Sequence, residues 1–360
     1  MSTHDDILLV GFGAVGVIYA LILSKTPNIR LTAIARGNFD KVSSRFDLRL
    51  GDVLAEFPPF VKGKGIDIKM VKSVAEAADR AYKYVLITTK ALPDVNPTPE
   101  ILAPLLTEEY SKHYPPPTFV ILQNGLGVEK DLYATIESCW KAEPRVLSAA
   151  VYIQANLVGD RDVVEQGPFD KLVCGAYRPG LLVDDDAKNT PEEAERLEAF
   201  AQLIRAGNGD IEIVPDIQRK KFAKNLWNLS FAAFATLIRQ PCPAFFWEET
   251  AEKIRPTLTK VLTEAVSVAR ALGYSEHAVP SSLVDSTIED TGGLHRPGKP
   301  STHRPSMLVD METRRPLEIE AIVGEVVRMG KELEVNVPIL ETVYTLLQVV
   351  QAGLVRGAYS

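Results

Sequence analysis

The sequence predicts a protein of two domains, an α/β domain built on a parallel sheet followed by an all-α domain. In the first half, short apolar runs of strand length alternate with segments of helical periodicity. This alternation is typical of a mostly parallel sheet with helices on both faces. From about residue 216 onward the strand pattern fades and helical periodicity remains. We therefore expect residues 1–214 to form the first domain and residues 215–360 the second.

The first domain contains several runs of strand length. We expect a strand at Ile7–Val10 and, after a glycine turn, a helix at Val15–Leu23. Alternating residues around Gly51-Asp52 predict a hairpin over residues 46–57. A further antiparallel pair is expected over residues 163–174, with Gly167 near its turn. The remaining strands are expected at Leu31–Ala35, Tyr84–Thr88, Phe119–Leu122 and Val146–Ile153.

A helix is expected to begin near Pro191, because Thr190 is a suitable N-cap and proline is favoured at the first helical position. Helical periodicity then covers three segments of the second domain, at residues 221–237, 252–272 and 317–333. Residues 292–303 are rich in glycine, proline and histidine, and we expect a loop there.

The composition excludes some classes of protein. With 360 residues and a net charge of −7, the chain lacks the basic character of a general nucleic-acid-binding protein. The cysteines are few, widely spaced and without metal-ligand spacing, which predicts a reducing compartment and no bound metal. No signal peptide and no apolar run of about 18 residues is apparent. We therefore expect a soluble cytoplasmic protein with no membrane or nucleic-acid partner.

The turn after the first strand carries the pattern G-x-G-x-x-G between a strand and a helix. Its residues are Gly11, Phe12, Gly13, Ala14, Val15 and Gly16. In this context the first glycine permits the tight turn and the second lets the backbone approach a pyrophosphate. The third lets the helix pack closely on the strand. The pattern predicts a Rossmann-type dinucleotide-binding domain, with these six residues binding the cofactor.

The end of the second strand indicates which nicotinamide cofactor is used. NAD enzymes usually have a carboxylate there, about 20 residues after the glycine motif, which binds the ribose hydroxyls. This chain has Arg36 instead. Because a guanidinium pairs well with a 2′-phosphate, we expect NADP (NADPH).

Two further strands end in polar residues. Lys90 follows the strand at Tyr84–Thr88, and Asn124 follows the strand at Phe119–Leu122. Ligands of open parallel sheets bind beyond the carboxyl ends of the strands. Lys90 and Asn124 are therefore candidates for binding cofactor and substrate.

The second domain begins with a basic helix that offers two pairs of residues. Lys224 and Asn228 are four residues apart and share a helical face, as do Lys221 and Asn225. An ammonium beside an amide can polarise and protonate a ketone oxygen. Helical spacing alone does not separate the two pairs. Further along, Glu318 and Glu320 are candidates for a buried carboxylate that orients the catalytic lysine.

Taken together, these blocks resemble the ketopantoate reductase family (2-dehydropantoate 2-reductases). The resemblance covers the chain from Gly11 to about Leu347. Its blocks are GFGAVG, TTKA around Lys90, LQNGLG around Asn124, KNLWN around Lys224, and SMLVD with RRPLEIEAIVG from Ser306 to Gly324. The resemblance implies hydride transfer from NADPH to the keto carbon of a 2-oxo acid, which gives a 2-hydroxy acid.

The resemblance also implies roles for individual residues. Lys224 matches the catalytic lysine, because Phe222 stands where the family usually has tryptophan, two residues before it. Glu318 matches the essential acid, expected to hold the ammonium of Lys224. The residues that match substrate-binding positions are Asn124, Asn228 and Ser306, and those that match cofactor positions include Arg36, Lys90 and Asn124.

Two departures bear on the substrate. Ala232-Ala233 replace an Asn-Pro pair of the family, and His303 replaces an asparagine three residues before the serine. A pocket with fewer amide donors favours a more apolar 2-oxo acid. Ketopantoate is the first expectation, and another branched or aromatic 2-oxo acid, as for a mandelate-type dehydrogenase, is the alternative. A non-catalytic NADP-binding sensor is a further alternative. A homodimer is compatible with the helical second domain.

Overall fold

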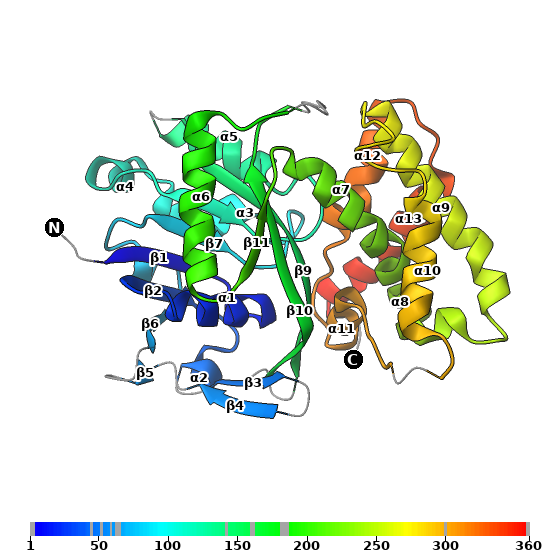
Figure 1. Ribbon diagram of the computed structural model, residues 1–360, viewed down its shortest axis with the longest axis horizontal. Helices are drawn as coiled ribbons and strands as arrows, with labels where there is room; N and C mark the ends of the chain where they lie inside the picture. The colour runs from blue at the N-terminus through cyan, green and yellow to red at the C-terminus, as the bar shows by residue number, and fades with distance from the viewer. Residues whose placement is uncertain are drawn as a thin grey trace.

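The computed structural model describes residues 4–43, 46–50, 53–57, 60–61, 66–140, 143–158, 163–180, 187–298 and 301–357. It has an α/β part and a helical part that lie side by side (Figure 1). The last strand ends at Ile213, and every element described after it is a helix. This agrees with the fold class that the sequence predicts.

Six strands form the parallel centre of the sheet, in the order β6, β2, β1, β7, β8, β9. The expected apolar runs all form strands, because both faces of these strands are buried. The bounds of the six are β1 Asp5–Val10, β2 Ile29–Ile34, β6 Ile66–Val71, β7 Tyr84–Ile87, β8 Thr118–Ile121 and β9 Val146–Val158.

Helices cover both faces of this sheet. On one face, α1 (Ala14–Ser24) and α6 (Pro191–Ala206) contribute to one hydrophobic core. On the other face, α3 (Thr98–Leu102), α4 (Glu108–His113) and α5 (Lys130–Cys139) contribute to a second core. The expected N-cap of α6 is confirmed, because the Thr190 hydroxyl accepts from the Glu193 backbone N–H in a capping box. The short elements α2 Phe39–Val42, η1 Ala75–Ala77 and η2 Ala103–Leu105 complete this part.

Beyond β9 the sheet continues with the long strand β10 (Val163–Ala176), which pairs with β9 in antiparallel orientation. The prediction that residues 163–174 fold into a hairpin with a turn near Gly167 is wrong. These residues form one strand, and its register shifts between Gln166 and Asp170, so Gly167 lies at a β-bulge. The expected hairpin is confirmed as β3 (Phe46–Leu50) and β4 (Val53–Phe57), whereas Gly51-Asp52 lie outside the described residues. The other strands are β5 Phe60–Val61 and β11 Asp210–Ile213.

The helical part surrounds a single hydrophobic core. It opens with α7 (Ile217–Trp227), which continues through a π-helical segment, η3 (Asn228–Ala232), into α8 (Ala233–Ile238). The other elements are η4 Cys242–Phe246, α9 Ala251–Ala271, α10 Leu283–His295, α11 Ser306–Glu312, η5 Glu320–Gly324, α12 Glu325–Glu332 and α13 Pro338–Val355.

The expected loop at residues 292–303 begins later than predicted. Helix α10 continues through Gly292 and Gly293 and ends at His295. A Cβ at Gly292 would lie 3.0 Å from a ring carbon of Phe246. Gly292 therefore allows the helix to pack closely on η4, and its presence is not the sign of a turn.

One described helix, α13, is long and apolar enough to cross a membrane, with a mean hydropathy of 1.3 over 18 residues. This differs from the expectation that the chain has no apolar run of about 18 residues. Its side chains at Leu340, Val343, Leu347 and Leu354 are at most 8% exposed and belong to the core of the helical part.

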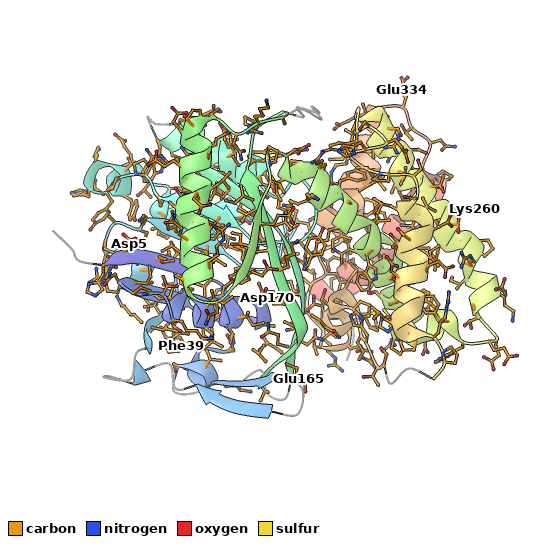
Figure 2. The ribbon with its side chains drawn as sticks, viewed as in Figure 1. Asp5, Phe39, Glu165, Asp170, Lys260 and Glu334 are labelled. Atoms are coloured by element: carbon orange, nitrogen blue, oxygen red, sulfur yellow. The ribbon has the colours of Figure 1, made fainter. Side chains whose placement is uncertain are left out.

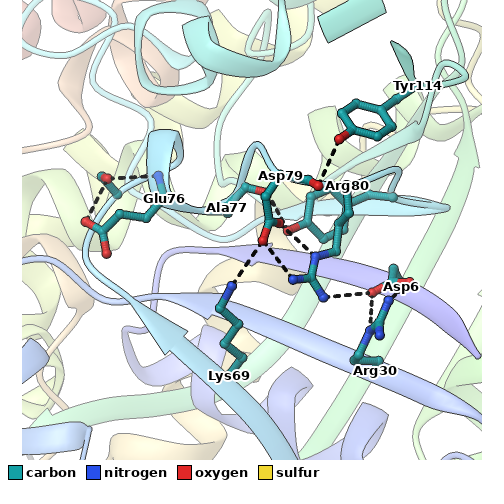
Figure 3. A network of polar contacts seen from close by, with 10 residues as sticks. Asp6, Arg30, Lys69, Glu76, Ala77, Asp79, Arg80 and Tyr114 are labelled. Carbon is teal, nitrogen blue, oxygen red and sulfur yellow. Dashed lines mark hydrogen bonds and ion pairs between the residues drawn. The ribbon is translucent and has the colours of Figure 1, made fainter.

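The two parts meet where α7 packs against β9 and β10, and side chains fill the space between the ribbons there (Figure 2). This contact brings one face of α7 to the carboxyl ends of the central strands. At the opposite, amino end of β1, Asp6 pairs with Arg30 and Arg80, and Arg80 also pairs with Asp79 (Figure 3). Such exposed ion pairs contribute little to stability individually.

Candidate active site

The glycine turn between β1 and α1 has the conformation that a dinucleotide-binding turn requires. Gly11 has a φ of +106°, which side chains disfavour, and a Cβ there would lie 2.8 Å from the Thr89 backbone nitrogen. A Cβ at Gly16 would lie 2.0 Å from the Gly11 carbonyl oxygen. The Thr88 hydroxyl donates to that oxygen at 2.6 Å. Gly11 and Gly16 are thus required by the packing of the turn itself.

Gly13 differs from these two glycines. A Cβ there would meet no heavy atom of the described residues within 4 Å. Gly13 is also the N-cap of α1, and no acidic residue lies in the first turn of that helix. The packing of the protein therefore does not require glycine at this position, whereas close approach of a ligand does. The amino end of a helix with free backbone N–H groups favours a phosphate there.

Arg36 follows β2 and is exposed beside this turn. In the amide orientation that satisfies both partners, the Asn96 side-chain oxygen accepts from the two guanidinium nitrogens of Arg36 at 2.9 and 3.2 Å. The Asn38 amide donates to the Phe12 carbonyl at 2.9 Å and so connects the segment after Arg36 to the glycine turn. Arg36 is thus held near the turn by a neutral partner, with no carboxylate in that contact.

Lys90 lies beyond β7 and binds two buried carboxylates. Its Nζ is 2.6 Å from Asp310 Oδ2 and 3.2 Å from Glu318 Oε2. The other oxygen of Glu318 accepts from the Ala91 backbone N–H at 3.0 Å. Burial lowers the pKa of Lys90, but the two carboxylates outweigh this effect and hold that pKa above its usual value. Lys90 is therefore a fixed positive charge.

Lys224, in the last turn of α7, meets Asn124 from the other side of the junction. Lys224 Nζ donates to Asn124 Oδ1 at 2.6 Å and lies 6.0 Å from the ring centroid of Tyr152. Burial lowers the pKa of Lys224 to about 8, even though the charge of Glu318 acts in the opposite direction. An ammonium with such a pKa can give up its proton near neutral pH, as a general acid must.

The expected contact between Lys224 and Glu318 is not formed. The described hydrogen bonds of the Glu318 carboxylate go to Lys90 and to the backbone of Ala91. Glu318 acts on Lys224 only through its charge, which raises the pKa of that lysine. The partner that holds the Lys224 ammonium is the amide of Asn124. Tertiary structure decides this pairing. Lys90 and Lys224 both reach the junction between the two parts of the protein, and Lys90 is the lysine that contacts the Glu318 carboxylate.

The structure distinguishes the two lysines of α7. Lys221 is 3% exposed and donates to Glu129, which is fully buried, and to Ser148 Oγ at 3.2 Å. Burial would raise the pKa of Glu129, but the charge of Lys221 and its hydrogen bonds hold that pKa below its usual value. Asn225 donates to the Ile322 carbonyl at 2.8 Å. Lys221 and Asn225 therefore bind other parts of the protein and connect α7 to its neighbours.

The remaining predicted residues lie on elements that border Lys224. Asn228 is half-buried and begins the π-helical segment η3. Ser306 is the exposed first residue of α11, which packs against η3.

Glu320 lies two residues after Glu318 in the sequence, but its carboxylate binds Arg328 at 2.7 Å and Tyr344 at 2.6 Å. Of the two glutamates, only Glu318 belongs to the site.

The sequence analysis assigned no role to Asp310, which is 2% exposed and binds Lys90 on one side and Arg315, at 2.9 Å, on the other. Its position four residues after Ser306, on the same helix, was the available signal. Tyr152, on β9, was also missed, because nothing in an alternating strand pattern distinguishes it from other strand residues.

Comparison with family models identifies both parts of the chain. Residues 7–179 match the model "Ketopantoate reductase PanE/ApbA", and residues 216–351 match "Ketopantoate reductase PanE/ApbA C terminal". An uncharacterized protein of Saccharomyces cerevisiae is 27% identical, and the match covers 97% of this chain and 94% of the relative. A 2-dehydropantoate 2-reductase of Mesorhizobium japonicum is 25% identical, with 98% and 99% covered.

Solved structures share the fold. A dimeric ketopantoate reductase from Staphylococcus aureus superposes with a TM-score of 0.66 at 22% identity, over 97% of this chain and 99% of that one. A D-mandelate dehydrogenase in complex with NADH and anilino(oxo)acetate superposes with a TM-score of 0.72 at 18% identity, again over 97% and 99%. At these identities the likeness is one of fold.

The buried pair of Lys221 and Glu129 yields a test of the two lysines. We expect Lys221→Met to lower the free energy of unfolding by roughly 3–5 kcal/mol, because it leaves the Glu129 carboxylate buried without a partner. Lys224→Met removes a lysine whose partner is neutral and should be tolerated far better. Urea denaturation followed by circular dichroism measures both. The double variant Glu129→Leu with Lys221→Met should recover most of the lost stability, and equal stability of the two single variants would contradict the assignment.

Proposed function

This chain belongs to the ketopantoate reductase family, and on that premise we propose that it reduces a small 2-oxo acid to the 2-hydroxy acid with NADPH. The observation that carries the proposal is the half-buried Lys224 ammonium, whose hydrogen-bond partner among the described residues is the neutral amide of Asn124 and whose pKa is lowered by burial to about 8. A proton donor of this kind is what reduction of a ketone needs at the developing oxygen anion.

The cofactor would bind along the turn from Gly11 to Gly16, with its pyrophosphate at the amino end of α1 and its 2′-phosphate at Arg36. The freedom of Gly13 from any packing requirement supports this placement. When bound, the reduced nicotinamide supplies the hydride. NADPH is favoured over NADH because Arg36, and not a carboxylate, follows β2.

The chain's own residues would handle the substrate and the proton. We assign Lys224 as the acid that protonates the substrate oxygen, and Asn124, Asn228 and Ser306 as residues that bind the substrate. We also propose that Lys90, beyond the carboxyl end of β7, lines the cofactor and substrate cleft as a hydrogen-bond donor, because its charge is already balanced by Asp310 and Glu318. Asp310 and Glu318 would then be positioning residues, because they touch Lys90 and hold it in place.

Ketopantoate is the first candidate substrate, because it is the substrate for which the family is named. A second candidate, an aromatic or branched 2-oxo acid, is favoured by one observation. Trp227, adjacent to Asn228, stacks on His303 with ring centroids 5.6 Å apart and planes 8° apart. Burial lowers the pKa of His303 to about 4, so the ring is neutral at pH 7. Two neutral aromatic rings beside a substrate-binding amide suit an apolar substrate tail.

We also propose that the protein is a homodimer. Helix α13 carries apolar side chains that are largely exposed, Leu346 at 51%, Val349 at 69% and Val355 at 55%. Exposed apolar groups on one helix favour association. A relative with the same fold is described as dimeric, which supports the proposal.

The proposed reaction is tested by following NADPH oxidation with ketopantoate and with a panel of branched and aromatic 2-oxo acids. We expect turnover with at least one of them, and a loss of roughly 10²–10⁴-fold in kcat for Lys224→Ala. Turnover with ketopantoate identifies the first candidate, and turnover with only the aromatic acids identifies the second. NADPH binding without turnover on any oxo acid would contradict the proposal and favour a cofactor-binding sensor.

The pKa of Lys224 sets a pH dependence. The acid is active when protonated, so kcat should fall as the pH rises through about 8, where Lys224 loses its proton. The pH profile of kcat under saturating substrate measures this. In Lys224→Arg the side chain stays charged at these pH values. We expect a much lower kcat in this variant, with no fall in kcat near pH 8. A fall in kcat near pH 8 that persists in this variant would show that another group causes it.

Arg36 should determine the choice of cofactor. Arg36→Asp replaces the proposed partner of the 2′-phosphate with a group that repels it and that can bind ribose hydroxyls. We expect the ratio of kcat/KM for NADPH over NADH to fall by about tenfold or more. Arg36→Gln, which removes the charge only, should raise the KM for NADPH and leave that for NADH nearly unchanged. An unaltered ratio in both variants would contradict the role of Arg36.

A further inference from the structure

Three side chains with metal-binding atoms meet in the helical part, and one of them, His303, is the ring that stacks on Trp227. They are Cys242 at the start of η4, His295 at the end of α10, and His303 in the segment before α11. One ligand atom from each lies within 4.8 Å of the others. The cluster therefore joins η4 to two segments that lie close to one another in the sequence, the end of α10 and the residues before α11.

The distance between the two imidazoles matches a tetrahedral metal site. His303 Nδ1 and His295 Nε2 are 3.3 Å apart. Two imidazole nitrogens bound to zinc at 2.0–2.1 Å in tetrahedral geometry are about 3.3–3.4 Å apart. The sulfur of Cys242 lies within 4.8 Å of both nitrogens and would have to move closer to complete the set. The two nitrogens already have the separation that a shared ion requires.

The surroundings of the cluster hold these rings in place. His295 Nδ1 lies 2.6 Å from Ser301 Oγ, so its other nitrogen, Nε2, is the one that faces His303. A hydrogen bond to the second ring nitrogen is the usual support for a metal-binding histidine. His303 is stacked on Trp227, and its carbonyl accepts from the Cys242 backbone N–H at 2.9 Å. All three residues are thus oriented by their neighbours.

The donor set selects the kind of ion. One sulfur and two nitrogens suit zinc, whereas magnesium and calcium take oxygen ligands. Thiol catalysis is a poor alternative, because Cys242 is fully buried and burial makes a thiol unreactive. A simple hydrogen bond between the two histidines accounts for their 3.3 Å separation, but not for the presence of the thiol beside them.

We propose that Cys242, His295 and His303 form a zinc-binding site, with water as the fourth ligand. The ion would connect the segment before α11 to α10 and η4. That segment leads directly into Ser306, so on the proposed function the zinc would also stabilise the position of a substrate-binding residue. Cysteine spacing did not indicate this site, because Cys242 is its one cysteine and the two histidines lie on other segments.

The first test uses the full-length wild-type protein, freed of metal with a chelator and titrated with Co²⁺ alone. Cobalt in a site with a cysteine ligand gives a thiolate-to-metal charge-transfer band in the near ultraviolet, and tetrahedral cobalt gives intense visible bands. We expect both, with saturation at about one ion per chain and displacement by Zn²⁺. Folded protein without a charge-transfer band would overturn the proposal, and the histidine pair would then be only hydrogen-bonded.

Variants identify the ligands. Cys242→Ser and His303→Asn should each abolish the charge-transfer band or weaken binding at least tenfold. Cys139→Ser and His277→Gln, which change a cysteine and a histidine outside the cluster, should leave it intact. His303→Asn is the more informative variant, because His303 is only half-buried and the exchange should preserve the fold. Circular dichroism verifies folding. A band that persists in both ligand variants would overturn the assignment.

A stability measurement separates this inference from the proposed reaction. Zn²⁺ should raise the Tm of the metal-free wild type by about 2 °C or more, and should not raise that of His303→Asn. An equal rise in both proteins would contradict the site. Neither the spectra nor the Tm depends on turnover. The zinc site can therefore be disproved without affecting the proposed reductase activity, and the reductase activity can be disproved without affecting the zinc site.

Discussion

The structure of the site depends on the burial of the Lys224 ammonium beside a neutral partner. Water stabilises a charged ammonium, and the junction between the two parts of the protein removes much of that water. Lys90, in the same region, keeps its charge because Asp310 and Glu318 bind it directly. Among the described residues, the Lys224 ammonium bonds to the neutral amide of Asn124, and its pKa is lowered. Two lysines at one junction thus differ in how readily they give up a proton.

This difference requires that α7 be held accurately against the sheet. Lys221, one turn before Lys224, reaches across the junction to Glu129 and Ser148. Asn225 binds the backbone of Ile322 on the other side. Because a charged pair buried at such a contact tolerates little displacement, these bonds fix the rotation of α7 about its axis. The rotation in turn directs Lys224 toward Asn124 at the end of β8.

The sequence was most informative where local chemistry determines structure. The glycine turn, the strands that end at Lys90 and Asn124, and the cap at Thr190 follow from local rules and were predicted. Contacts between distant segments were not predictable in the same way. Spacing could not separate Lys221 from Lys224, because burial at the junction decides between them. The family resemblance placed Glu318 beside Lys224, whereas its described hydrogen bonds go to Lys90 and Ala91. Gly167 was expected near a turn and Gly292 in a loop, whereas Gly167 lies at a bulge and Gly292 permits close helix packing.

The proposed reaction requires that burial tune the ammonium of Lys224 to lose its proton near neutral pH. NMR titration of the wild-type protein with isotopically labelled lysine measures this directly, with the signal assigned by comparison with Lys224→Arg. We expect one lysine resonance that titrates near pH 8 and is absent from the variant. A Lys224 resonance that titrates at its ordinary pKa of 10.5 would contradict it.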